Sequence, residues 1–147
     1  MFPENFLIQQ RIALDVEASS KKRVLELLAE LLHSDTEDSR TVFDQLLERE
    51  RLGSTGMGQG IALPHARVQG LSEARGGFVR LAQGVDFGAV DGAPVDLIFA
   101  LLVPSEATQA HLQLLARLAG LFRDAQLCSD LRQATQVEQV LARLLAS

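Results

Sequence analysis

His65 is the side chain in this sequence that is best placed to do chemistry. It lies in residues 53–67, which read GSTGMGQGIALPHAR. Glycines at alternating positions lead into a short apolar run, 61–63, and Pro64 ends that run because proline cannot donate to a sheet ladder. The pattern predicts one imidazole at the end of a short strand, beside a glycine loop with free backbone N–H groups. Such a place suits an anion, and an unperturbed imidazole titrates close to neutral pH.

Several common chemistries do not fit this segment. It lacks the Gly-Lys-Ser/Thr ending of a phosphate-binding P-loop, its glycines are out of register with Gly-x-Gly-x-x-Gly, and it leads into a strand. His65 and His111 are too few for a metal site, and no His-Glu-x-x-His spacing occurs. Ser54 lies outside a Gly-x-Ser-x-Gly elbow. The sequence therefore predicts no metal ion, nucleotide or other cofactor.

The chemistry that remains after these exclusions is a histidine that accepts a phosphoryl group. A neutral imidazole can form a P–N bond at one ring nitrogen if the other nitrogen is held and the phosphoryl oxygens are neutralised. His65 is the candidate nucleophile, and His111, in the first turn of a predicted helix, and Arg49, with its guanidinium fork, are candidate ligands of the oxygens. Ser54 and Thr55, with the loop amides, could supply neutral donors. A loop-edge histidine satisfied by backbone hydrogen bonds, and a solvated Arg49, remain open as alternatives.

Hydrophobic periodicity predicts the elements that must position these side chains. Strands are expected at 12–16, 61–63, 76–81 and, as a short piece, 85–87, with residues 67–75 as a polar connection. The nearly continuous apolar run 95–103 is typical of a strand buried on both faces. Helices are expected over 21–33, 39–51, 108–122, 124–133 and 136–145. This order predicts an α/β (α+β) fold, one mixed sheet flanked by helices, in a single domain over residues 1–147.

The helix predicted over 108–122 bears directly on the site, because it carries His111. Its apolar stripe is expected to comprise Leu112, Leu115, Leu118, Ala119 and Phe122.

Composition excludes further classes of function. The chain has 147 residues, of which 47% are hydrophobic, and a formal charge of −5, which argues against nucleic acid as a partner. A single cysteine, Cys128, rules out an internal disulfide. No apolar stretch approaches the roughly 18–20 residues that span a bilayer, and the N-terminus does not resemble a signal peptide. We expect a soluble, cytoplasmic protein that does not insert into a membrane.

Four segments together resemble one protein family. Residues 60–66, GIALPHA, are similar to the phosphorylation-site motif of enzyme IIA domains of the fructose/mannitol class in the bacterial phosphotransferase system (PTS). Arg49-Glu50, 94–104 (PVDLIFALLVP) and 111–115 (HLQLL) resemble that family's Arg-Glu pair, core strand and second-histidine helix. Residues 52–56, LGSTG, are more similar to the nitrogen-regulatory branch, EIIA-Ntr. Ala66 departs conservatively from the glycine that is common there.

The resemblance implies a mechanism and a set of partners. An HPr-type phosphocarrier is expected to dock over a shallow apolar surface and pass its phosphoryl group to Nε2 of His65, with Arg49 and His111 stabilising the oxygens. The protein would be a phosphocarrier and regulator more than a turnover enzyme, and its phosphorylation state would control partners such as potassium-transport proteins or sensor kinases. Two alternatives stay open: a sugar-specific enzyme IIA that serves a IIB component of a permease, and a binding module of the same fold that is no longer phosphorylated.

Overall fold

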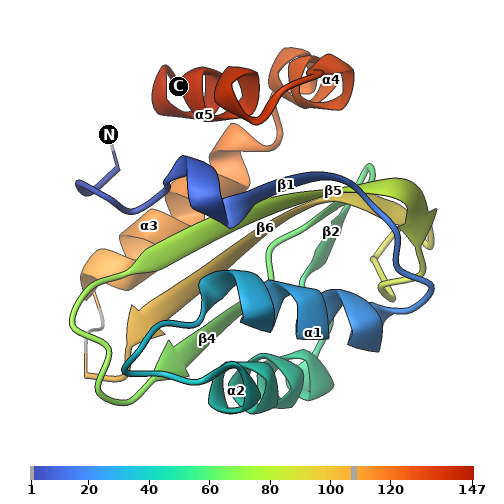
Figure 1. Ribbon diagram of the computed structural model, residues 1–147. Coiled ribbons are helices and arrows are strands. Elements are labelled where there is room, and N and C mark those ends of the chain that lie inside the picture. The colour runs from blue at the N-terminus through green and yellow to red at the C-terminus, as the bar shows by residue number, and fades with distance from the viewer. Residues whose placement is uncertain (1, 107–108) are drawn as a thin grey trace.

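Six strands form one mixed β-sheet that carries helices on both faces (Figure 1). The structure is a computed structural model, and it describes residues 2–106 and 109–147. The strand order is β1-β5-β6-β3-β2, and β4 pairs with β6 beyond the end of β3. This confirms the predicted α/β class. The strands are β1 (Ile12–Val16), β2 (Gly56–Gly58), β3 (Ile61–Ala62), β4 (His65–Val68), β5 (Arg75–Val85) and β6 (Val95–Pro104).

Five α-helices and one short 3-10 helix account for the remaining regular structure of the described residues. Side chains cap three of the α-helices at their N-termini: Ser20, Asp38 and Asp124 each accept a backbone N–H from the first turn that follows. The expected helix start at Thr108 lies outside the described residues. The helices are η1 (Gln9–Arg11), α1 (Lys21–Leu32), α2 (Ser39–Leu52), α3 (Gln109–Leu121), α4 (Ala125–Gln133) and α5 (Val137–Leu145).

Two hydrophobic cores lie on opposite faces of the sheet, and strand β6 contributes to both. Ile98, Ala100 and Leu102 pack into the core beneath α1 and α2, and Phe99 and Leu101 face the core beneath α3, α4 and α5. Successive side chains of a strand point to opposite faces. The continuous apolar run of β6 therefore fills two cores, as the prediction of a strand buried on both faces requires.

Two predictions about strands were wrong. Residues 85–87 are not a separate strand, because β5 continues to Val85, which pairs with Val95 after an irregularity in the ladder. The exposed residues 82–84 interrupt the apolar pattern and make one strand read as two. The chain after His65 is also a strand: β4 pairs in parallel with β6, and residues 66 and 68 are buried.

The predicted apolar stripe of α3 was partly wrong. Leu118 is buried, but Leu112 is 60% exposed and Leu114 takes a buried position instead. Leucine occurs on more than one side of this helix, so the hydrophobic period fits two rotations of the helix about its axis. The rotation observed leaves Leu112 at the surface beside His111.

Candidate functional site

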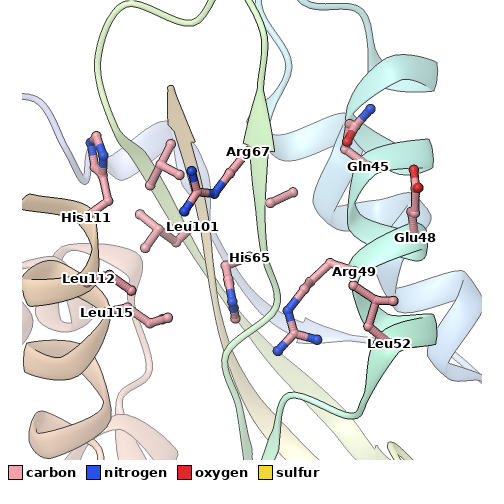
Figure 2. Close-up of a pocket in the computed structure, with 12 residues that line it drawn as sticks. Gln45, Glu48, Arg49, Leu52, His65, Arg67, Leu101, His111, Leu112 and Leu115 are labelled. Atoms are coloured by element: carbon pink, nitrogen blue, oxygen red, sulfur yellow. The ribbon is translucent and has the colours of Figure 1, made fainter. Parts of the chain in front are cut away.

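Three predicted site residues, Arg49, His65 and His111, line one pocket of about 420 Å³ (Figure 2). They come from the last turn of α2, the first residue of β4 and the start of α3 as described. Residues separated by up to 62 positions in the sequence are thus brought together where these three elements meet. The complete lining is Gln45, Glu48, Arg49, Leu52, His65, Ala66, Arg67, Leu101, Val103, His111, Leu112 and Leu115.

His65 is held by the chain immediately before it. Pro64 separates β3 from β4, so His65 begins a strand. The sequence had predicted that His65 would follow the end of one. Its Nδ1 lies 2.9 Å from the carbonyl oxygen of Leu63. A carbonyl only accepts, so this contact assigns the ring proton to Nδ1 and leaves the lone pair on Nε2. Nε2 is therefore the ring nitrogen with a lone pair available to form a new bond.

The surroundings of His65 keep its ring neutral. Burial lowers the pKa of the imidazole below its usual value of 6.5, and the hydrogen bond to Leu63 opposes that effect. The nearby guanidinium of Arg49 lowers the pKa of His65 further. A neutral ring with a free lone pair is the form that can attack phosphorus.

Arg49 is fixed by the loop that follows its helix. Its Nη1 donates to the carbonyl oxygen of Gly53 over 2.8 Å. In Figure 2 the guanidinium points toward the ring of His65. The side chain is therefore oriented before any ligand arrives, which favours the predicted role over a solvated helix end.

His111 lines the same pocket, but its ring points away from the ring of His65 (Figure 2). Its Nδ1 is buried and has no hydrogen-bond partner among the residues that the structure describes. A contact between His111 and a group on His65 therefore requires the ring of His111 to turn about its side-chain bonds.

Ser54 and Thr55 lie outside the pocket lining. The hydroxyl and the backbone N–H of Thr55 both donate to the carboxylate of Glu50, and Thr55 is buried. The Ser54 hydroxyl donates to the carbonyl of Phe87 over 2.6 Å and accepts the N–H of Gly56 over 3.0 Å. The two hydroxyls thus hold the loop in place, and a role in phosphate binding remains a prediction.

The glycine-rich segment is a strand and a turn, not an open loop of free amides. Gly56 and Gly58 pair with β3 as strand β2. The N–H of Gln59 donates to the carboxylate of Asp91 over 2.9 Å. The N–H groups of Thr55, Gly56 and Gln59 therefore already have partners, so the segment is not the open loop of free N–H groups that was expected.

Two residues of the site region were given no role from the sequence: Glu50, which was named only as part of the Arg-Glu pair, and Arg67. Glu50 is buried, and its carboxylate forms an ion pair with Lys21 at 2.5 Å as well as its bonds to Thr55. Arg67 lines the pocket and is exposed. Arg67 could have been found from its spacing, because residues two apart in a strand share a face and Arg67 is two residues after His65. It was not found because the segment after His65 was not predicted to be a strand.

Two leucines at the pocket are exposed to solvent. Leu52 is 81% exposed and Leu112 is 60% exposed, although both line the pocket. Exposed apolar side chains that gather around a polar site are typical of a surface that another protein covers.

The described part of the chain holds neither a metal-binding cluster nor a membrane-spanning helix. Over residues 2–106 and 109–147, no group of three or more His, Cys, Asp or Glu side chains could hold a metal ion. No helix in these ranges has both the length and the apolar composition needed to cross a membrane.

Comparison with known proteins identifies the family. Residues 5–147 match the family model described as "Phosphoenolpyruvate-dependent sugar phosphotransferase system, EIIA 2". A nitrogen regulatory protein of Pseudomonas aeruginosa is 44% identical over 137 residues, which cover 92% of this chain and 89% of that protein. One from Klebsiella oxytoca is 41% identical over 138 residues, covering 92% and 85%. The crystal structure of the nitrogen regulatory protein IIA-Ntr from Neisseria meningitidis superposes with a TM-score of 0.91 at 44% identity, over 95% of this chain and 96% of that one. The chain therefore belongs to the EIIA 2 family of the phosphotransferase system and, within it, to the nitrogen-regulatory branch.

Proposed function

We propose that this protein is a phosphoryl-accepting regulator. Nε2 of His65 takes a phosphoryl group from the phosphohistidine of an HPr-type phosphocarrier, and the two forms of the protein bind different partners. The observation that carries the proposal is the state of His65, a neutral ring with its proton held on Nδ1 by Leu63 and with Nε2 available in a pocket that Arg49 lines.

The transfer needs only groups that the two proteins supply. The P–N bond of the donor breaks as a P–N bond to Nε2 of His65 forms, and the donor imidazole leaves with the electron pair of the broken bond. Charge spreads over three oxygens in the transition state, so a fixed cation such as Arg49 lowers the barrier. His111 turns toward the pocket and donates to the same oxygens. The donor is already activated, and the proposed step uses no metal ion or nucleotide.

The regulatory signal is electrostatic. A phosphoryl group adds about two negative charges at neutral pH. These charges would lie within a rim formed by exposed Leu52 and Leu112. A partner that packs apolar side chains on this rim must then desolvate the new charge, so such partners are released. We place this exchange in the cytoplasm and take potassium-transport proteins and sensor kinases as the first partners to test.

Phosphorylation of His65→Ala tests the proposal. The wild-type protein, incubated with a phosphorylated HPr-type carrier, should gain one acid-labile phosphoryl group, measured by intact-protein mass spectrometry. His65→Ala should gain none, because the nucleophile is gone. His33→Ala is the matched control, since His33 is exposed at the end of α1 and is not part of the pocket lining. Normal phosphorylation of His65→Ala would contradict the proposal.

The same preparation separates the two alternatives. Rapid transfer from the phosphorylated protein to a fructose- or mannitol-type IIB domain would assign it to sugar uptake. Absence of phosphorylation in the wild-type protein would assign it to binding alone. Stable retention of the phosphoryl group in the presence of IIB is the result that the regulatory proposal predicts.

A further inference from the structure

Arg67 is a cation of the pocket to which the proposed transfer gives no role. We propose that Arg67 binds the phosphoryl group once it is on His65, and so determines how the phosphoryl group is divided between this protein and its donor at equilibrium. The inference rests on the proposed function and goes beyond it, because it assigns the stability of the phosphorylated state to a particular side chain.

The geometry of β4 places Arg67 beside His65. Ala66 and Val68 are buried, so His65 and Arg67 project together from the opposite side of the strand. Two residues of a strand span about 6.6 Å, a distance that an arginine side chain bridges easily. In Figure 2 the guanidinium of Arg67 lies between His65 and His111, within the pocket that all three line.

Arg67 is held much more loosely than Arg49. Among residues 2–106 and 109–147, the Arg67 guanidinium makes one hydrogen bond, 3.3 Å long from Nη1 to the carbonyl of Ser105, at the weak end of the range for N–H···O bonds. Arg49 has a 2.8 Å bond to Gly53. Arg49 is therefore fixed in advance of transfer, whereas Arg67 can leave Ser105 for a stronger, charge-assisted bond when an anion appears nearby.

The chemistry of the exchange makes such a bond decisive for the equilibrium. The bond that breaks in the donor and the bond that forms on His65 are both P–N bonds to an imidazole. The covalent terms nearly cancel, so the position of equilibrium depends on how well each protein binds the phosphoryl oxygens. A cation that engages only after transfer stabilises the product, and it slows the return of the phosphoryl group more than it speeds the arrival.

The experiment measures both rates and the equilibrium. A phosphorylated HPr-type carrier, freed of phosphoenolpyruvate, is mixed with an equal amount of the protein, and both phosphorylated forms are quantified over time. Arg67→Ala should shift the equilibrium about fivefold toward the donor, the upper end of what one exposed ion pair contributes. The change should appear mainly as faster back-transfer. Arg67→Lys should give an intermediate shift, because an ammonium keeps the charge and loses the fork.

Arg51→Ala is the matched control. Arg51 is an exposed arginine at the end of α2 that is absent from the pocket lining, and its removal changes the net charge by the same amount. It should shift the equilibrium less than twofold. An equal shift for Arg67→Ala and Arg51→Ala would overturn the inference and leave the proposed function standing. A wild-type protein that takes up no phosphoryl group would overturn both, so the two failures are distinguishable.

Discussion

At the scale of the residue, the hydrogen bond from His65 to Leu63 decides which ring nitrogen carries the proton. The donated proton sits on Nδ1, and Nε2 keeps its lone pair. Had the carbonyl of Leu63 been out of reach, both tautomers would compete. The local run Leu63-Pro64-His65 therefore selects the tautomer of the ring, and under the proposed function it selects the nitrogen that accepts the phosphoryl group.

The first prediction concerns the titration of His65. Because burial and Arg49 disfavour the charged ring, the pKa of His65 should lie below 6.5. Between that lower pKa and 6.5 the unfolded chain binds more protons than the folded one. As the pH falls through this window, the unfolded chain takes up the proton first, so the folded state loses stability, and the transfer rate falls when the pH reaches the lower pKa of the folded ring. Long-range ¹H–¹⁵N NMR should show a protonated Nδ1 at pH 7. A pKa above 6.5, or a proton on Nε2, would contradict this account.

Glu50 is the second residue whose loss should be measurable. Its buried carboxylate joins Lys21 of α1 to Thr55 before β2, and Arg49 is its neighbour in the chain. Glu50→Ala leaves these donors without their acceptor and should cost about 2 kcal/mol of unfolding free energy, measured in urea. The neighbouring Glu48 is exposed, so Glu48→Ala should change stability by less than about 0.5 kcal/mol. Equal costs for the two variants would show that the Glu50 network is not stabilising.

Sequence reasoning selected three residues that line one pocket, but it did not predict their contacts. His65, Arg49 and His111 could be selected because their side chains have few alternative uses at those positions. The burial of Glu50 and the outward turn of the His111 ring depend on contacts between distant elements, which no local pattern reports. Ser54 and Thr55 illustrate the same limit, because a hydroxyl that could bind phosphate can equally bind Glu50 or Phe87.

At the scale of the element, the turn between β2 and β3 is pinned from two sides. Arg132 of α4 donates to both carboxylate oxygens of Asp96, at 2.9 Å each, and to the carbonyl of Gln59 at 3.0 Å. Asp91 accepts the N–H of Gln59 from the other direction. The start of β3, which leads to His65, is thus fixed by α4 and by the loop before β6.

Gly60 and Gly70 form a matched pair for testing this turn. Both have φ near +85°, where an alanine is strained. A Cβ on Gly60 would lie 2.5 Å from Nη2 of Arg132, whereas a Cβ on Gly70 meets nothing within 4 Å. Gly70→Ala should cost about 1 kcal/mol of unfolding free energy. Gly60→Ala should cost at least about 1 kcal/mol more, because it also displaces Arg132. Equal costs in thermal or urea unfolding would show that the Arg132 contact is unimportant.

The elements that could be predicted from sequence are long and bury one face. The α1 and α2 helices could be predicted because their apolar residues recur on one face. Strand β2 was missed because it begins and ends with glycine, and β4 was missed because it has only four residues. Neither presents an alternating pattern long enough to stand out, and each is stabilised by its pairing with a neighbouring strand.

At the scale of the whole molecule, a buried arginine ties the C-terminal helices to the sheet. Arg80 of β5 is 8% exposed, and its Nη1 donates to the carbonyls of Leu131, Arg132 and Ala134 at the end of α4. Its Nη2 forms an ion pair with Asp15 of β1 at 3.0 Å. One side chain therefore joins two strands to the helix that carries Arg132.

Removing this side chain should weaken the entire fold. Arg80→Ala leaves the carbonyls at the end of α4 without their donor and should cost about 3 kcal/mol of unfolding free energy, measured by urea denaturation. Arg143→Ala removes a half-exposed ion pair with Asp130 and should cost less than about 1 kcal/mol. A small loss for Arg80→Ala would show that packing of α4 and α5 on the sheet suffices without it.

The shallow pocket around His65 has a consequence for timing. Under the proposed function, the donor must reach Nε2 through the same opening that a regulated partner would cover, between Leu52 and Leu112. A partner seated there would shield Nε2, so only unbound molecules would be phosphorylated. By linkage, a saturating partner that prefers the bare form would lower the equilibrium constant for phosphorylation by the factor by which phosphorylation weakens its own binding. The abundance of the partner would then affect phosphorylation just as phosphorylation affects partner binding, and both effects would act at one small surface.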